Sequence, residues 1–489
     1  MKYLPLITIL LPIFGSILIP LVHFKSRRSR NIYTEILVIL NSILVYLTIF
    51  LDRQIVCEVI HFTGDLSISF VMDDLSVVFA GLVAFLWPLA TLYSFEYMKK
   101  EEHESTFFMF FVMTYGVTLG IAQAEDYITM YCFYEFLTIV TVPLVMHTLT
   151  REAILASRKY LYYSLGGAAF AFISLIFIIR YGSTNRFIFG GTLDGTLVGD
   201  RTNVLLLIYV LAFFGFGVKA ALCPFNSWLP QASVAPTPVT ALLHAVAVVK
   251  AGAFAIIRMT YYSFGADFLR GTWAQYTVMA ATIFTIVYGC TRALKETHFK
   301  RRLAYSTISN LSYILFGCAL MTPLGMAGAV THLVFHALMK ITSFFCAGAV
   351  MHQTERNYVY ELNGLGIKMP KTFVIFTISS LALMGVPGFA GFISKWSLAQ
   401  AAVESGNPLA YVGVAALLVS ALLTAIYMLS VVFRAFWPGK DFDMKQVATC
   451  SDPNWVMIVP LAIFAVVILL FGVYSIPFTE FFAQVAHLQ

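Results

Sequence analysis

Long apolar segments recur along the whole 489-residue sequence, and they limit the possible folds more than any other feature. A helix that crosses about 30 Å of hydrocarbon needs about 20 mostly apolar residues. Fourteen segments reach that length: 3–23, 32–51, 73–97, 106–124, 127–148, 158–180, 203–224, 236–258, 273–293, 303–321, 325–350, 372–400, 409–435 and 455–477. Only 11% of the residues are charged, against about 25% in soluble domains. The sequence therefore predicts an all-α polytopic membrane protein with 14 transmembrane helices.

The basic residues between these segments and at their ends gather on one side of the predicted membrane. Connections that follow odd-numbered segments contain twenty Lys and Arg residues. The opposite side contains seven: Lys2, Arg53, Arg180, Arg186, Arg201, Arg258 and Arg270. Because connections rich in Lys and Arg remain in the cytoplasm, we expect a prokaryotic cell (inner) membrane protein with both termini on the non-cytoplasmic side.

Four lysines lie inside the apolar segments, namely Lys219, Lys250, Lys340 and Lys395. Each lysine at bilayer depth costs about 2.5–3.5 kcal/mol on insertion scales, so four of them need a functional explanation. Lysine differs from arginine because a desolvated lysine can release its proton near neutral pH. For Lys395, reaching out to the membrane interface is an open alternative.

Glu135 is the carboxylate that lies farthest from the ends of the predicted segments. It follows Asp126 by nine residues, which places it about 13.5 Å into a helix. An ionised carboxylate at that depth needs a cationic partner, and Lys219 is the candidate. A neutral, hydrogen-bonded glutamic acid is the alternative.

The stretch "HLVFHALMK" places His332, His336 and Lys340 at positions i, i+4 and i+8, on one face of a helix. His244 and Lys250 form a second pair, six residues apart. A lone core histidine is usually satisfied by a neighbouring hydroxyl, but three groups in register favour a proton relay. Bis-histidine heme needs ligands on facing helices, whereas His332 and His336 share one helix. A zinc site would need further ligands, and no Cys or carboxylate accompanies the two histidines. We therefore predict no cofactor and no metal.

Two of the apolar segments contain residues that interrupt helices. Pro224 and Pro230 fall in "KAALCPFNSWLPQASVAPTPV", and Pro387 and Gly388 fall in "MGVPGFAGFISKW". Proline removes a backbone donor and clashes one turn back, and broken helices at matching positions of two halves indicate the ion path of a transporter.

The breaks divide the chain into two matching units. The predicted domains are residues 1–105 with helices 1–3, residues 106–260 with helices 4–8, residues 273–436 with helices 9–13, and residues 437–489 with helix 14. The broken helix is the fourth of each five-helix unit. Because five is odd, the two units cross the membrane in opposite directions, which makes them inverted repeats.

Five motifs carry a resemblance to a known family: "YEFLTIVTVPL", "KAALCPFNSWLPQASVAPTPVTALLHAVAVVKAGAFAI", "RRLAYSTISNLSYI", "HLVFHALMK" and "GFISKW". The chain resembles the antiporter-like subunits shared by respiratory complex I, Mrp-type sodium/proton antiporters and membrane-bound hydrogenases. The resemblance implies fourteen helices, a Glu135–Lys219 pair, a central Lys250 and a terminal Lys395. Lysine at positions 340 and 395 looks more like the D-type subunit of Mrp antiporters or the hydrogenase counterpart.

We expect a subunit that translocates protons, with or without sodium, inside a larger complex of membrane subunits and lipid. The expected route runs from Lys219 through Lys250, His336 and Lys340 to Lys395, with Glu135 tuning Lys219. Neither a nucleotide motif nor a redox centre is present in the sequence, and no nucleic acid partner is expected. Membership of a redox-driven translocase and membership of an antiporter are both open, as are a carrier of a small solute, a heme- or quinone-binding protein and a structural scaffold.

Overall fold

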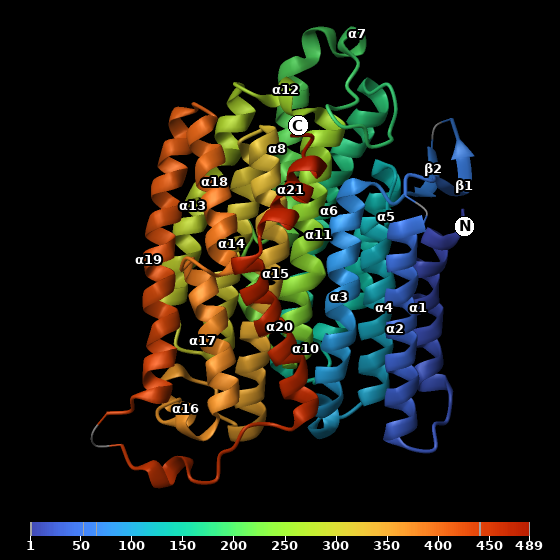
Figure 1. Ribbon diagram of the computed structural model, residues 1–489. Helices are drawn as coiled ribbons and strands as arrows, with labels where there is room; N and C mark the ends of the chain where they lie inside the picture. The colour runs from blue at the N-terminus through green and yellow to red at the C-terminus, as the bar shows by residue number, and fades with distance from the viewer. Residues whose placement is uncertain (1, 52, 65, 440–441, 489) are drawn as a thin grey trace.

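The computed structural model describes residues 2–51, 53–64, 66–439 and 442–488, and most of them lie in long helices that run side by side (Figure 1). Within these ranges, twelve helical stretches are long and apolar enough to cross a membrane. The long helices are α1 Leu4–Leu21, α2 Arg27–Leu51, α3 Asp74–Tyr97, α4 Glu104–Ala122, α5 Tyr127–Val145, α6 Arg151–Tyr181, α8 Thr202–Lys219, α11 Val248–Arg258, α13 Trp273–Lys295, α14 Phe299–Ala319, α15 Pro323–Thr354, α17 Pro370–Met384, α18 Ala390–Glu404, α19 Pro408–Phe436 and α20 Trp455–Val473. The short helices are α7 Gly195–Val198, α9 Trp228–Gln231, α10 Thr237–Ala241, α12 Ala266–Leu269, α16 Leu365–Lys368 and α21 Ile476–Val485.

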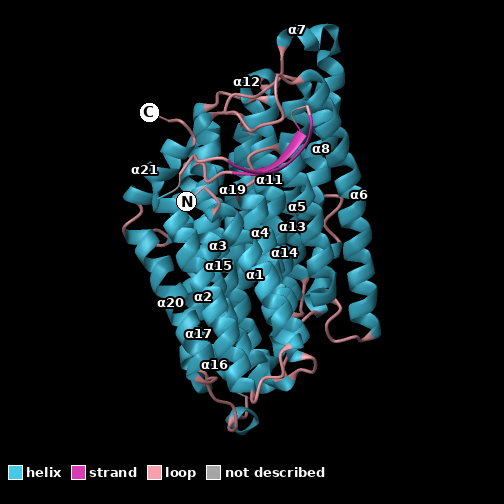
Figure 2. Ribbon diagram, turned by 90° about the vertical axis from the view of Figure 1, so that its right-hand side faces the viewer, coloured by secondary structure: helices cyan, strands magenta, loops and turns pink. Residues whose placement is uncertain are grey.

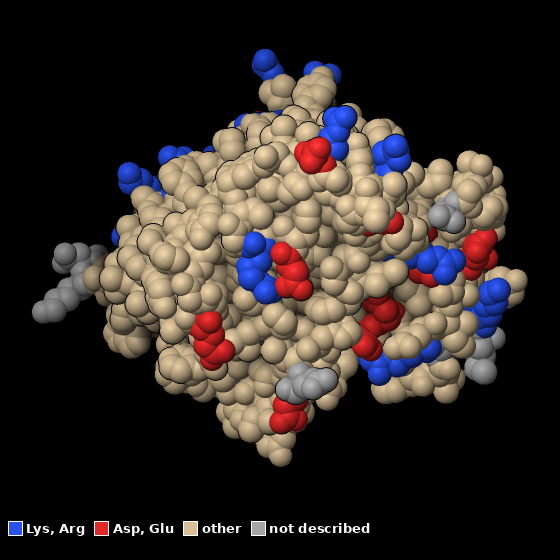
Figure 3. Space-filling view, turned by 90° about the horizontal axis from the view of Figure 1, so that it is seen from above, with Lys and Arg blue, Asp and Glu red and all other residues tan. Residues whose placement is uncertain are grey.

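Both chain ends lie toward the upper end of the bundle, together with α7 and α12, whereas α16 lies at the lower end (Figure 1). Seen from above, the upper face has scattered charged side chains on a largely uncharged surface (Figure 3). Three ion pairs belong to elements at this end: Arg53–Asp74, Arg186–Glu125 and Arg270–Asp267.

The prediction of an all-α fold is wrong in one small element. Strands β1 (Cys57–Thr63) and β2 (Leu66–Phe70) form an antiparallel hairpin, in which Cys57 pairs with Phe70. The hairpin is seen at the upper end of the molecule in Figure 2. Both strands are short, and β2 (LSISF) alternates in polarity, which is a pattern of period two. A search for apolar segments of about 20 residues passes over such a pattern.

Several helix boundaries differ from the predicted ones. Helix α6 begins seven residues before position 158, because the Thr150 side chain accepts a hydrogen bond from the Ala153 N–H and caps the helix. Helix α2 begins at Arg27 instead of residue 32, so Glu35 lies about 12 Å into it. Glu135 is therefore not the only carboxylate that lies far from a helix end.

The predicted segment 236–258 is not one regular helix. It consists of α10, a π-helical turn η4 (Leu242–Val246) and α11, followed by a second π-helical segment η5 (Met259–Phe264). A π-helical turn contains one residue more than an α-helical turn, and such turns occur often at functional sites.

Arg258, counted above with the basic residues of the non-cytoplasmic side, is the last residue of α11 and is fully buried. Its guanidinium donates to both carboxylate oxygens of Asp73, at 2.6 and 2.7 Å, and to the Ser76 hydroxyl at 2.9 Å. Asp73 also caps α3 by accepting from the Ser76 N–H. The ion pair thus connects the beginning of α3 to the end of α11.

Candidate functional site

Two helical stretches form the centre of the molecule. In α15, every residue from Gly325 to Val350 is buried, and all residues of α10, η4 and α11 are buried as well. Helices of this kind contact protein on all sides. The titratable side chains on these stretches therefore point into protein and not into lipid.

Lys250 of α11 and His336 of α15 are in direct contact. The Lys250 Nζ and the His336 Nδ1 lie 2.6 Å apart, and both side chains are fully buried. One nitrogen must donate and the other accept, so the contact holds a single shared proton position between two groups that can each bind a proton.

His332 extends this contact along α15 toward Lys395. The rings of His336 and His332 stack with centroids 5.6 Å apart, and the His332 Nδ1 lies 2.9 Å from the Ser394 Oγ. The Tyr313 ring lies 5.1 Å from the His332 ring and 5.4 Å from the Lys395 Nζ. A line of polar and titratable groups therefore runs from Lys250 to Lys395.

Lys395 lies beside the interruption between α17 and α18. Helix α17 ends at Met384 and α18 begins at Ala390, so the break contains Pro387 and Gly388. The Lys395 Nζ donates to the carbonyl oxygens of Leu383 and Met384, at 2.6 and 3.1 Å, which are among those left without helical partners where α17 ends. A mainly apolar pocket of about 540 Å³ opens next to Lys395 between α18 and α19.

Lys340 lies to one side of this line. Its Nζ donates to the Ser306 Oγ at 2.6 Å and to the Leu303 carbonyl at 3.3 Å, both on α14. The Tyr427 hydroxyl of α19 donates to the same Ser306 Oγ at 2.7 Å. The expected order placed Lys340 between His336 and Lys395, but the contacts place His332 there.

His244 lies within the π-helical turn η4, on the same stretch as Lys250. Its ring packs against the Phe344 ring, with centroids 4.8 Å apart. Both ring nitrogens of His244 are buried, and the Leu229 backbone is a polar group beside the ring.

Glu135 and Lys219 lie within electrostatic reach of each other, but no direct ion pair joins the two side chains. The Lys219 Nζ donates to the Tyr134 carbonyl and lies 3.4 Å from the centroid of the Tyr134 ring. Glu135 is half-buried, and its Oε1 has no hydrogen-bond partner among the described residues. Tyr134 therefore takes the direct contact with the Lys219 ammonium, and Glu135 acts on Lys219 through its charge.

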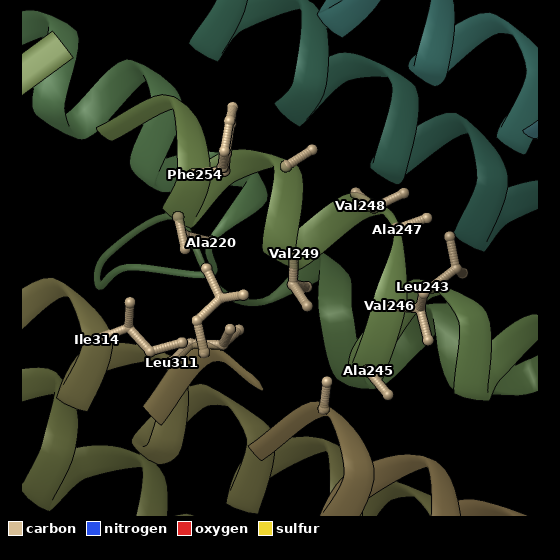
Figure 4. Close-up of a cluster of buried hydrophobic side chains, with 14 of the residues drawn as sticks. Ala220, Leu243, Ala245, Val246, Ala247, Val248, Val249, Phe254, Leu311 and Ile314 are labelled. Atoms are coloured by element: carbon tan, nitrogen blue, oxygen red, sulfur yellow. The ribbon is translucent and has the colours of Figure 1, made fainter. Parts of the chain in front are cut away.

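Helix α8 ends at Lys219, and the chain continues without regular helix until α9, across Pro224. Pro230 lies within the four-residue α9. The end of α8 packs closely on α11 at Gly252, where a Cβ atom would lie 2.6 Å from the Ala220 nitrogen. Figure 4 shows the apolar side chains at this crossing, including Ala220 and Val249, with Leu311 and Ile314 of α14 below them.

The structure brings together groups that the sequence interpretation missed. They are hydroxyl-bearing or aromatic side chains: Tyr134, Ser306, Tyr313, Ser394 and Tyr427. Ser306 and Tyr313 belong to "RRLAYSTISNLSYI", where polar residues recur at helical spacing inside a buried helix. This recurrence of polar residues could have indicated from the sequence that the helix contributes to the site. The described residues contain no group of three or more His, Cys, Asp or Glu that could hold a metal ion.

Two family models match the sequence. Residues 124–435 match "NADH:quinone oxidoreductase/Mrp antiporter, TM", and residues 60–108 match "NADH-Ubiquinone oxidoreductase (complex I), chain 5 N-terminus". The first match includes every candidate residue described above.

Curated relatives are similar over most of the chain. NADH-quinone oxidoreductase subunit N of Desulforudis audaxviator is 31% identical over 376 residues, covering 76% of this chain and 73% of that protein. Subunit L of the same enzyme from Rickettsia typhi is 28% identical, covering 94% of this chain and 70% of that protein. The A-type subunit of the Na⁺/H⁺ antiporter of Alkalihalophilus pseudofirmus is 28% identical, covering 89% of this chain and 57% of that protein.

Two solved structures share the fold. A chain of the membrane-bound sulfane sulfur reductase, an archaeal respiratory membrane complex, aligns with a TM-score of 0.85 at 24% identity, covering 100% of this chain and 97% of that chain. A chain of the Mrp complex from Dietzia sp. aligns with a TM-score of 0.84 at 22% identity, covering 99% of this chain and 52% of that chain.

Proposed function

This chain belongs to the NADH:quinone oxidoreductase/Mrp antiporter family of membrane subunits, and on that premise we propose that it translocates protons across the membrane as one subunit of a larger complex. The contact between Lys250 and His336 is the observation that carries the proposal. Two buried bases that share one proton position can exchange a proton with little movement of heavy atoms.

In the proposed route, a proton on the Lys250 ammonium passes to His336 as the Lys250 N–H bond breaks and the His336 N–H bond forms. It then passes by way of His332 to the region of Ser394 and Tyr313, and reaches Lys395. The contacts between neighbouring groups support this order. Lys340 is assigned to a position beside the route, where its ammonium group donates to the Ser306 hydroxyl.

Glu135 and Lys219 have a controlling role in this proposal. The Lys219 ammonium rests on a carbonyl and a ring face, while Glu135 has an unpaired oxygen. Moving the two charged groups closer would favour the protonated lysine, and separating them would favour proton release. Because Glu135 is only partly buried, a neighbouring subunit is in a position to set that distance.

The proposal includes a membrane topology. Helix α14 and the interrupted pair α17–α18 are assigned as crossings in addition to the twelve long apolar stretches, which gives fourteen. Residues 106–260 and 273–436 are assigned as inverted repeats, between residues 1–105 and 437–489. The lower end of the bundle, with most of the basic connections, is assigned to the cytoplasm, so both termini lie outside.

The proposed partners are homologous and other membrane subunits, as in the complexes from which the relatives are named. Whether sodium moves together with protons is left open. Lysine at both 340 and 395 favours the D-type subunit of Mrp antiporters or the hydrogenase counterpart.

The test uses the complex that an affinity tag on this chain purifies, reconstituted into potassium-loaded liposomes. Valinomycin then imposes an inside-negative potential, and an internal pH-sensitive dye records proton uptake. We expect Lys250→Met to lower the valinomycin-dependent rate by about 100-fold, because a positioned proton-transfer group contributes about that much. Lys295→Met is the matched control, since Lys295 is exposed at the end of α13. A Lys250→Met complex that takes up protons at the wild-type rate would contradict the proposal.

A further inference from the structure

A polar pocket of about 250 Å³ opens at the lower end of the bundle, where α3 connects to α4 and α5 connects to α6. Its charged and titratable lining residues are Lys100, Glu101, Glu102, His103 and His147. Two of them are fixed in place, since the His147 Nε2 lies 3.0 Å from the Glu102 carbonyl oxygen. The pocket therefore gathers four proton-binding side chains other than lysine at one opening.

Glu101 connects this pocket to a buried lysine. Glu101 is half-buried on the pocket wall, whereas Lys300, on the first turn of α14, is only 6% exposed. Burial raises the pKa of the Glu101 carboxyl, and the positive charge of Lys300 opposes that rise. The two groups thus lie within electrostatic reach, with Lys300 on the inner side.

Lys300 is fixed at the beginning of the stretch that carries the central site. Its Nζ donates to the Ala235 carbonyl at 2.8 Å, and the Thr240 hydroxyl donates to the same oxygen at 3.1 Å. His244 follows Thr240 by four residues, one turn further along. The charge of Lys300 also acts on the His244 ring.

We propose that the pocket around Glu101 and the buried Lys300 form the proton inlet from the lower face, leading through His244 to Lys250. This inference rests on the proposed function, because it needs a proton route for the inlet to supply. Glu101 takes a proton from water in the pocket. A deprotonated Lys300 takes that proton inward as the Glu101 O–H bond breaks and the Lys300 N–H bond forms, and then releases it toward His244.

The competing interpretation is that Lys300 only anchors the connection at Ala235. An arginine at position 300 keeps a positive charge and an N–H donor for that carbonyl, but it does not release its proton in a protein. Replacement by arginine therefore separates anchoring from proton transfer, and replacement by methionine removes both.

The experiment measures potential-driven proton uptake by the reconstituted complex with the variants Lys300→Arg, Lys300→Met and Glu101→Gln, beside Lys250→Met and Lys295→Met. The melting temperature and the subunit composition of each purified complex show whether it is folded and assembled. We expect both Lys300 variants to lower the rate by about 100-fold, Glu101→Gln to lower it, and Lys295→Met to leave it unchanged.

The arms separate the two proposals. If Lys250→Met abolishes uptake but Lys300→Arg retains the wild-type rate, Lys300 is an anchor and the inlet is overturned while the proposed function stands. If Glu101→Gln retains the wild-type rate, the pocket is not the mouth of the inlet, and the inference is overturned. If Lys250→Met also retains the wild-type rate, the proposed function itself fails.

Discussion

At the scale of single residues, the central site combines titratable groups with very close packing. Lys250 contacts His336 on one side of α11, and two residues later Gly252 allows the backbone of α8 to approach. A Cβ atom at Gly252 would lie 2.6 Å from the Ala220 nitrogen and 3.0 Å from the Phe216 carbonyl oxygen. Both are backbone atoms, which cannot move aside as a flexible side chain can.

We therefore predict that Gly252→Ala destabilises the protein by about 1–3 kcal/mol, because inserting a methyl group into close packing forces the backbone to shift. Gly166→Ala is the control, since Gly166 also lies in a helix but has no atom within 4 Å of the added Cβ. The control is expected to be neutral or to stabilise by about 0.5–1 kcal/mol. Thermal unfolding in detergent measures both, and equal melting temperatures for the two variants would refute the packing argument.

At the scale of secondary-structure elements, the Asp73–Arg258 pair joins α3 to α11. Arg258 is fully buried, and its charge also lies over the rings of Phe187, Phe254 and Tyr262, at 4.8 to 5.2 Å from the centroids. Removing the carboxylate would leave this buried charge without its partner, which typically costs about 3–5 kcal/mol.

We predict that Asp73→Asn lowers stability by about that amount, whereas Asp74→Asn changes it by about 0–1 kcal/mol, because the Asp74–Arg53 pair is exposed to solvent. The two neighbouring positions form a matched pair for thermal unfolding. A shift in melting temperature as large for Asp74→Asn as for Asp73→Asn would show that the buried Asp73–Arg258 pair contributes no more to stability than the exposed pair.

The same pair gives a pH dependence. Burial acts to raise the pKa of Asp73, but the charge and hydrogen bonds of Arg258 outweigh it, so the pKa lies below the ordinary value of 3.8. A carboxyl with a lowered pKa stabilises the folded state above its unfolded pKa and loses this contribution as the pH falls through the folded pKa. The difference between wild type and Asp73→Asn should therefore be constant near neutral pH and shrink below about pH 4.

The elements that the sequence predicts well are those fixed by local rules. Apolar length predicts the long helices, and proline and glycine predict the interruptions near Pro224 and Pro387. The hairpin β1–β2 and the turn η4 are different, because they depend on pairing and packing with residues far along the chain. No local pattern around His244 distinguishes a π-helical turn from a regular one.

The candidate site shows the same limit. The spacing of His332, His336 and Lys340 places them on one face of α15, as predicted. The partner of each group could not be read from spacing, because α14, α17 and α18 supply Ser306, the Leu383 carbonyl and Ser394 from distant parts of the sequence. Glu135 and Lys219 interact through their charges, but a backbone carbonyl and an aromatic ring take the direct contact with the lysine.

At the scale of the whole molecule, the two ends of the bundle differ in charge. On the upper face, charged side chains are scattered over a largely uncharged surface (Figure 3), and Arg53, Arg186 and Arg270 are each paired with a carboxylate. The basic residues that the sequence places on the opposite side include Arg28 and Lys295, which are exposed. This difference supports the proposed orientation, in which the lower end faces the cytoplasm.

We predict that single cysteines at positions 28 and 200 react from opposite sides of the membrane, in a chain whose seven native cysteines have been replaced. A membrane-impermeant maleimide added to intact cells should label the cysteine at Asp200 and not the one at Arg28, and in inverted vesicles the pattern should reverse. Transport by the cysteine-free parent serves as the control for folding. Labelling of both positions from the same side would contradict the proposed topology.

The π-helical turn η4 has a consequence for how this chain can vary. Deleting the extra residue within Leu242–Val246 would restore a regular helix and would remove an irregular stretch of backbone. It would also rotate everything after it by about 100°, which would turn Lys250 away from His336. The π-helical turn thus directs the Lys250 side chain toward His336, and a regular α-helix at this position would break that contact.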